Sequence, residues 1–134
     1  MARILLIEDD NEVRTMLRLT LIHFGHAVIE ARNGKEGLEL FKDANADLVI
    51  TDIVMPEKEG LEVLVELRKK QVLPVKIIAI SGGGRQKAAH YLRLAELMGA
   101  ARILAKPFSN EVLIAMIDEL LPDGGAPAQT VVAL

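Results

Sequence analysis

"LVITDIVMPEKEG", residues 48–60, is a β-rich run that ends in a carboxylate. Residues 48–51 have the continuous pattern of a parallel strand that is buried on both faces. Asp52 follows at once, and residues 53–55 are apolar again before Pro56 interrupts the segment. An ionised acid beside so much apolar surface is unfavourable unless a cation compensates its charge. The segment therefore predicts a buried strand with a charged site at its end.

The alternation of strand-like and helix-like patterns continues along the chain. Short β-rich runs occur at residues 4–7, 27–30, 48–51, 75–80 and 101–105. Helical patterns follow these runs at residues 10–24, 35–43, 60–70, 86–98 and after Ser109, which is placed to cap the last helix. Five such units imply right-handed crossovers and a parallel sheet covered on both faces. We therefore expect an α/β fold, a doubly wound (βα)5 domain with a five-stranded parallel sheet.

The composition excludes several classes of protein. The net charge of −3 disfavours direct nucleic-acid binding, because such proteins usually carry a basic face. The absence of cysteine and the presence of only three scattered histidines argue against thiolate chemistry and a zinc site. No apolar run has the length of a membrane span, and the start lacks the layout of a signal peptide. We therefore expect a cytoplasmic protein with no membrane partner.

The length and the C-terminal composition indicate one domain and a tail. A chain of 134 residues suffices for one domain with a real core and is too short for two. Residues 122–134 are rich in Gly, Pro and Ala, which favours a flexible C-terminal tail or the start of a linker. We therefore place the folded domain at residues 1–121.

Five polar residues follow predicted strands and should meet at one edge of the sheet. They are Glu8, Asp9, Asp52, Ser81 and Lys106. Three close carboxylates repel one another by about 4 kcal/mol per pair at an intermediate dielectric, and Lys106 compensates only one charge. The remaining charge calls for a divalent cation with oxygen ligands, and Mg²⁺ fits because it accepts carboxylates, waters and phosphate oxygens.

A carboxylate beside a cation, a lysine and a hydroxyl suits phosphoryl transfer. Asp52 could act as the nucleophile and form an aspartyl phosphate. The metal and Lys106 would neutralise charge on the transferred oxygens, and Ser81 could donate a hydrogen bond to the new phosphoryl group.

Four motifs in this order resemble the receiver domain of two-component response regulators. They are ILLIEDD (4–10), DLVITDIVMPEKEG (47–60), IIAISGG (77–83) and ILAKPF (103–108). The resemblance covers residues 3–121 and implies the flavodoxin-like strand order 2-1-3-4-5. It implies a phosphoacceptor switch that is not an enzyme in its own right, although it assists its own phosphorylation and dephosphorylation. The implied phosphodonor is a histidine kinase or a histidine phosphotransfer protein.

The same resemblance implies a role for each site residue. Asp52 is then the phosphoacceptor. Glu8 and Asp9 hold Mg²⁺ together with Asp52 and the backbone carbonyl of Val54. Ser81 is then the switch hydroxyl and Lys106 the phosphate-sensing base, with a cis peptide bond between Lys106 and Pro107.

The sequence departs from the family pattern where the switch is read out. Ile103 occupies a position that is usually aromatic, so a rotating ring cannot carry the signal. Residues 82–84 are all glycine, so ordering this loop costs more conformational entropy. The expected partner surface combines the predicted helix at 86–98, the strand at 101–105 and the last helix, with Tyr91, Leu94 and Arg102 on it. Neither departure affects the phosphorylation chemistry.

Alternative hypotheses remain open from the sequence. Asp9 alone could merely cap the first helix. An aspartate-nucleophile phosphatase of the haloacid-dehalogenase type would also use Mg²⁺ and an acid at a strand end, but it requires a second Asp where this chain has Val54. A receiver-like binding module that is never phosphorylated is the third possibility, and the complete set of five polar residues argues against it.

Overall fold

The computed structural model describes residues 2–53, 60–70, 75–82, 93–97 and 99–122. The strands are β1 (Arg3–Ile7), β2 (Ala27–Ala31), β3 (Leu48–Asp52), β4 (Lys76–Ser81) and β5 (Arg102–Ala105). The helices are α1 (Asn11–His23), α2 (Gly34–Ala44), α3 (Gly60–Lys70) and α5 (Asn110–Leu120). Residues 93–97 are also helical and belong to the helix predicted at 86–98, of which residues 86–92 and 98 lie outside the described part.

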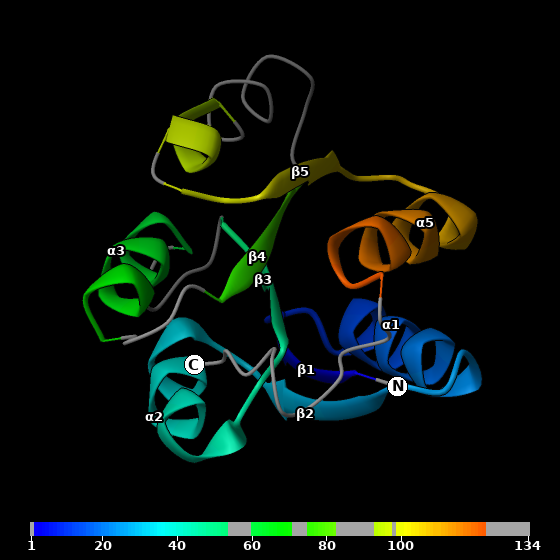
Figure 1. Cartoon of the computed structure of the whole chain (residues 1–134), viewed down its shortest axis with the longest axis horizontal. Helices are drawn as coiled ribbons and strands as arrows, with labels where there is room; N and C mark the ends of the chain where they lie inside the picture. Colours follow the sequence, from blue (N-terminus) through cyan, green and yellow to red (C-terminus); the bar gives the residue numbers. More distant parts are fainter. Residues whose placement is uncertain (1, 54–59, 71–74, 83–92, 98, 123–134) are drawn as a thin grey trace.

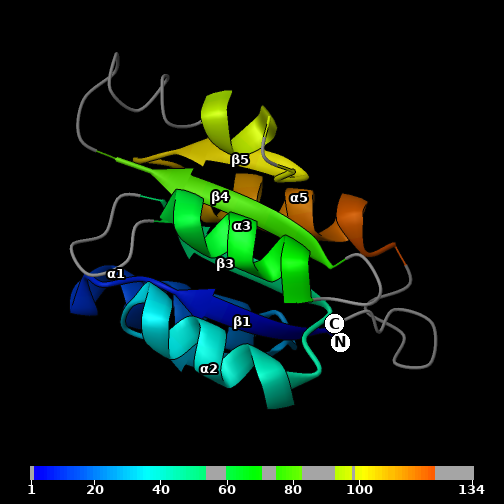
Figure 2. The same ribbon diagram turned by 90° about the vertical axis from the view of Figure 1, so that its left-hand side faces the viewer.

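All five strands pair in parallel in one sheet, in the order β2-β1-β3-β4-β5 (Figure 1). This confirms the predicted α/β class and the flavodoxin-like order. The helices α2 and α3 cover one face of the sheet, and α1 and α5 cover the other (Figures 1 and 2). The chain passes from β1 to β2 on one side and then crosses back over β1 to β3 on the other side. The order of the strands therefore reverses direction between β1 and β3.

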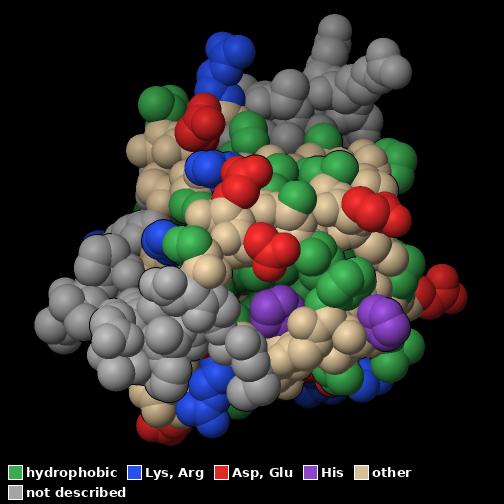
Figure 3. Space-filling view, turned by 45° about the vertical axis from the view of Figure 1, so that its right-hand side comes forward, with side chains coloured by type: hydrophobic (Ala, Val, Ile, Leu, Met, Phe, Trp, Pro, Cys, Tyr) green, Lys and Arg blue, Asp and Glu red, His purple; other side chains and the backbone are tan. Residues whose placement is uncertain are grey.

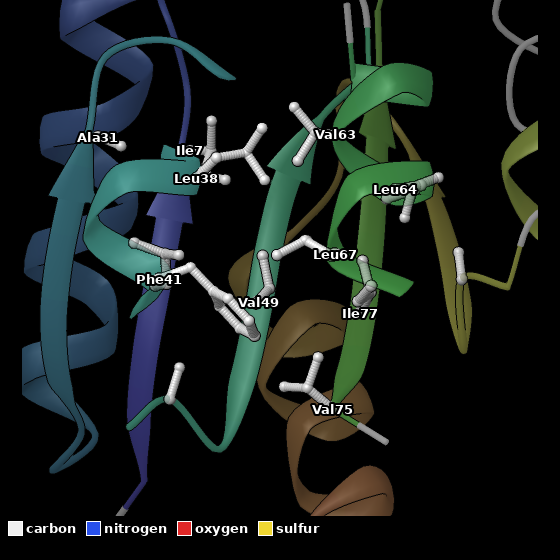
Figure 4. Close-up of a cluster of buried hydrophobic side chains, with 14 of the residues drawn as sticks. Ile7, Ala31, Leu38, Phe41, Val49, Val63, Leu64, Leu67, Val75 and Ile77 are labelled. Carbon is white, nitrogen blue, oxygen red and sulfur yellow. The ribbon is translucent and has the colours of Figure 1, made fainter. Parts of the chain in front are cut away.

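Two aliphatic cores, one on each face, hold the layers together. On one side, Leu38 and Phe41 of α2 and Leu67 of α3 point toward Val49 of β3 (Figure 4). On the other side, leucines and isoleucines of α1 and α5 pack on alternate strand residues. Both faces of β1 and β3 are therefore buried, which explains why these strands are continuously apolar in sequence.

Helix ends differ from the predictions in one functionally important detail. Asp10 is the N-cap of α1, and its carboxylate accepts hydrogen bonds from the amides of Glu12 and Val13 at 2.9 and 3.1 Å. The alternative that Asp9 caps this helix is therefore wrong, because its neighbour does so. The predicted cap of α5 is confirmed, since the Ser109 hydroxyl accepts from the amide of Val112 at 3.2 Å.

Two further predictions concern the C-terminal tail and membrane crossing. Residues 123–134 of the predicted tail lie outside the described residues. Within the described part, no helix combines the length and the apolar character that a membrane crossing requires.

Candidate functional site

The carboxyl ends of the strands bring four of the predicted side chains to one edge of the sheet. Glu8 directly follows β1, Asp52 ends β3, Ser81 ends β4 and Lys106 directly follows β5. The strand ends are aligned by main-chain hydrogen bonds, including one from the Lys106 amide to the Ser81 carbonyl at 2.8 Å. The β1 and β3 ends are neighbours at the point where the chain changes direction, which is where open α/β sheets form their sites.

Three carboxylates form a cluster at this point. One oxygen each from Glu8, Asp9 and Asp52 lies within 4.8 Å of the others. Glu8 and Asp52 are buried, at 1% and 5% exposure, whereas Asp9 is exposed. Opposite ligands of an octahedral Mg²⁺ ion are about 4 Å apart, so the three oxygens could share one ion after a small adjustment. An all-oxygen, acidic donor set fits a hard cation such as Mg²⁺.

Lys106 connects the two buried acids. Its Nζ donates to Glu8 Oε1 at 2.8 Å and to Asp52 Oδ2 at 2.9 Å. Burial acts to lower the pKa of Lys106, but the hydrogen bonds to both carboxylates outweigh it, and the pKa lies above its ordinary value. The lysine is therefore protonated and supplies the positive charge that the end of β3 requires.

The site strongly affects the protonation of Glu8. Burial raises the pKa of Glu8 to about 7, and the hydrogen bond from Lys106 offsets only part of this rise. The negative charge of Asp52 adds to the increase. Without a further cation, the cluster therefore retains excess negative charge that is costly to keep ionised.

Ser81 and Gly82 lie beside the lysine. The Ser81 hydroxyl is buried and donates to the Gly82 carbonyl over 3.4 Å, which is long for an O–H···O hydrogen bond. A methyl group on Gly82 would lie 3.2 Å from Lys106 Cδ, so this glycine leaves room for the lysine stem. Sequence reasoning treated Gly82 only as part of a free loop, because its contact with Lys106 depends on how β4 and β5 pair.

Two remaining predictions concern the backbone. The Lys106–Pro107 peptide bond is cis, as expected. The carbonyl of Val54, predicted as a metal ligand, lies outside the described residues.

The arrangement of strand order, acid cluster and bridging lysine agrees with a comparison against protein families. Residues 4–118 match the model of the response regulator receiver domain. The chain belongs to this family. Receiver domains are generally non-enzymatic switches of two-component signalling, which accept a phosphoryl group, and they bind Mg²⁺ at an acidic pocket.

Individual relatives of this receiver domain extend the comparison. The transcriptional regulatory protein AfsQ1 of Streptomyces coelicolor is 34% identical over 124 residues, which cover 92% of this chain and 53% of that protein. The transcriptional regulatory protein CpxR of Escherichia coli is 34% identical over 121 residues, covering 90% and 50%. The chain thus spans about half the length of these curated relatives.

A solved structure shows the same architecture. The receiver domain protein (CheY-like) of Methanospirillum hungatei superimposes with a TM-score of 0.80 at 26% identity, covering 92% of this chain and 95% of that one. This chain and that receiver domain therefore share one fold over nearly their whole lengths, in agreement with the family match.

Proposed function

We propose that this receiver domain takes a phosphoryl group onto Asp52 from the phosphohistidine of a histidine kinase or a histidine phosphotransfer protein. The observation that carries the proposal is Lys106 bonded to both Glu8 and Asp52, with Asp9 close enough to complete an acidic cluster. Glu8, Asp9 and Asp52 would hold Mg²⁺, together with the carbonyl of Val54. When bound, Mg²⁺ supplies positive charge to the transferred phosphoryl oxygens.

The transfer step follows from the groups at the end of β3. A carboxylate oxygen of Asp52 forms a bond to phosphorus while the P–N bond of the phosphohistidine breaks, and the electron pair of that bond stays on the imidazole. Lys106 already donates a hydrogen bond to the Asp52 carboxylate, and its ammonium group can then bond to the negatively charged phosphoryl oxygens. No new cation has to be recruited from solvent for this interaction.

Ser81 is suited to detect the product. Its hydroxyl gives up only a 3.4 Å hydrogen bond when it turns from the Gly82 carbonyl toward a phosphoryl oxygen. The loss is small, whereas a hydrogen bond to a charged oxygen is about twice as strong as a neutral one. Movement of Ser81 would shift the chain at Gly82 and so alter the surface beyond β4.

The signal would reach a partner protein on the surface of residues 93–97, β5 and α5. Ile103 of β5 is half-buried and packs against the core beneath α2 and α3, so it offers no ring that could rotate. Arg102 pairs with Glu119 across this surface at 3.4 Å, and Leu97 is 78% exposed. Tyr91, predicted here, lies outside the described residues. We propose an exposed contact surface for the downstream target, without direct nucleic-acid binding.

The phosphodonor would dock along α1. Met16, Leu19 and Ile22 of this helix are about half exposed, and Met16 and Leu19 line a groove that begins at Asn11, two residues after Asp9. Figure 3 shows exposed hydrophobic side chains among acidic ones on the side toward α1 and α5. A partner whose phosphohistidine reaches Asp52 must cover the adjacent rim of the sheet, so it would also bury this apolar face.

The alternative functions have less support. Membership of the receiver family disfavours a phosphatase of the haloacid-dehalogenase type. Such an enzyme requires a second Asp at the position where this chain has Val54. The complete set of Glu8, Asp9, Asp52, Ser81 and Lys106 argues against a binding module that is never phosphorylated. We propose residues 1–121 as the receiver unit and 122–134 as a flexible tail or linker start. The cytoplasmic location stays a prediction.

Incubation with Mg²⁺ and acetyl phosphate, followed by intact mass measurement, tests the proposal. We expect an increase equal to one phosphoryl group in the wild type and none in Asp52→Asn. Asp43→Asn is a matched control, because Asp43 is exposed in the last turn of α2, and it should retain the increase. An unmodified wild type with every phosphodonor, or an equal adduct in Asp52→Asn, would contradict the proposal.

A further inference from the structure

Arg14 of α1 reaches back to the loop that carries the acid pair. Its side chain is only 11% exposed. One terminal nitrogen donates to the backbone carbonyl of Glu8 at 2.9 Å, and the other donates to Asn11 Oδ1 at 2.6 Å. The guanidinium therefore joins the end of β1 to the first turn of α1.

Glu30 of β2 orients this guanidinium from the other side. Glu30 Oε1 lies 3.5 Å from Arg14 Nε, and Oε2 lies 3.3 Å from Arg18 Nε. The two arginines thus share one carboxylate, but of these two arginines only Arg14 has a hydrogen bond to Glu8 in the described part of the chain. Arginine suits this place because its planar fork holds several acceptors at fixed angles.

The bond to the Glu8 carbonyl determines how Asp9 leaves the strand. A peptide group is planar, so fixing the direction of the Glu8 carbonyl fixes the plane that contains the Asp9 nitrogen and Cα. The Glu8 side chain is held separately, by Lys106 and by the Asp10 amide at 3.1 Å. Asp9 is exposed, and no comparable side-chain anchor is seen for it within the described part of the chain.

We propose that Arg14 is a positioning residue for the metal site. Its guanidinium, held by Glu30, fixes the Glu8–Asp9 peptide so that the Asp9 carboxylate faces Asp52 at the distance one cation requires. The inference rests on the proposed Mg²⁺ function of the acid cluster. It assigns Arg14 a role through Asp9, without contact to the ion or to the phosphoryl group.

The sign of a charge effect separates this role from simple electrostatics. Arg14 is a cation close to a cation site, so removal of its charge alone would strengthen Mg²⁺ binding. Loss of positioning would weaken it, and substitution of a residue that supports metal ligands typically lowers metal affinity by about 10–100-fold. A merely structural role would lower the thermal midpoint and leave the affinity of the folded protein unchanged.

Calorimetric titration of the unphosphorylated protein with Mg²⁺ tests the proposal. We expect Arg14→Met to weaken binding about tenfold or more. Arg14→Lys should weaken it as well, because the lysine keeps the charge but loses the fork. Arg18→Met is the matched control, since Arg18 contacts the same Glu30 without bonding to the loop, and it should bind like the wild type.

Hydrogen exchange supplies a second readout. The Asp9 and Asp10 amides should exchange faster in both Arg14 variants, and those of β3 and β4 should be unchanged. If Arg14→Met does not fold, Arg14→Lys decides. Unchanged or stronger Mg²⁺ binding in a folded Arg14 variant would overturn this inference alone. A wild type that binds no Mg²⁺ would overturn it together with the metal site of the proposed function.

Discussion

Lys106 bonds to both buried acids of this receiver domain. It serves two buried carboxylates at once, and a metal ion at the cluster would interact with the same two carboxylates. The lysine therefore has two opposite effects, because it stabilises the metal-free protein and opposes the first step toward phosphorylation.

Substitution of Lys106 by methionine should separate these effects. Lys106→Met retains most of the apolar stem and removes the competing charge, so Mg²⁺ affinity should rise by about tenfold, equivalent to about 1.4 kcal/mol. Phosphorylation by acetyl phosphate should nevertheless become slower, because the phosphoryl oxygens lose a cation. Calorimetric titration and the rate of the mass increase measure the two quantities. Weaker Mg²⁺ binding in the folded variant would contradict the competition.

Glu8 gives the metal-free protein a characteristic dependence on pH. Burial raises the pKa of Glu8 from 4.5 to about 7, so the folded state holds a proton that the unfolded state has lost. The contribution of Glu8 to the free energy of unfolding is therefore full below about pH 4.5 and is lost as the pH rises through about 7. The loss amounts to at most about 3 kcal/mol.

Urea unfolding of wild type and Glu8→Gln in metal-free buffer measures this contribution. The stability of the wild type relative to the variant should fall between about pH 5 and about pH 8. The comparison cancels the opposite effect of His26, whose pKa is lowered by burial in both proteins. A difference that stays constant with pH would show that Glu8 titrates normally.

Sequence reasoning identified the site residues but not all of their contacts. Asp52 could be found because it ends an apolar strand, and Glu8 and Lys106 because they follow two others. The contact between Arg14 and the Glu8 carbonyl could not be found, since it depends on the path of the loop between β1 and α1. The same loop explains why Asp10, and not Asp9, caps the helix.

At the scale of elements, we propose two roles for α1. Its first turn supports the acid loop, and its exposed side offers Met16, Leu19 and Ile22 to a partner. The helical pattern at residues 10–24 correctly predicts that Leu17 and Leu21 are buried, but it places the half-exposed Met16 on the same apolar side. Leu19 and Ile22 carry no such signal, because scattered surface leucines are common and only their position beside the site gives them meaning.

A charge on this face should separate two routes of phosphorylation. Leu19→Glu places a carboxylate in the groove, so transfer from the cognate phosphodonor protein should fall about tenfold or more, as for loss of a central interface side chain. Phosphorylation by acetyl phosphate should be unchanged, because the small donor needs no docking surface. Leu40→Glu on α2, which covers the opposite face of the sheet, is the control. Equal transfer rates for all three proteins would place the docking surface elsewhere.

At the scale of the whole molecule, the strand order creates the site. The neighbouring ends of β1 and β3, at the change of chain direction, bring Glu8 and Asp52 together across 44 positions of sequence. The alternation of elements predicted the parallel sheet, but the order of its strands came only from the family resemblance, because periodicity carries no information on which strands are neighbours.

Locating the phosphoryl group in the chain is the most direct test of phosphorylation at Asp52. Protein treated with Mg²⁺ and acetyl phosphate can be reduced with borohydride, which converts an aspartyl phosphate to homoserine, and then digested and sequenced by mass spectrometry. We expect homoserine at position 52 and unmodified residues at Glu8 and Asp9. Modification at another residue, with Asp52 intact, would contradict it.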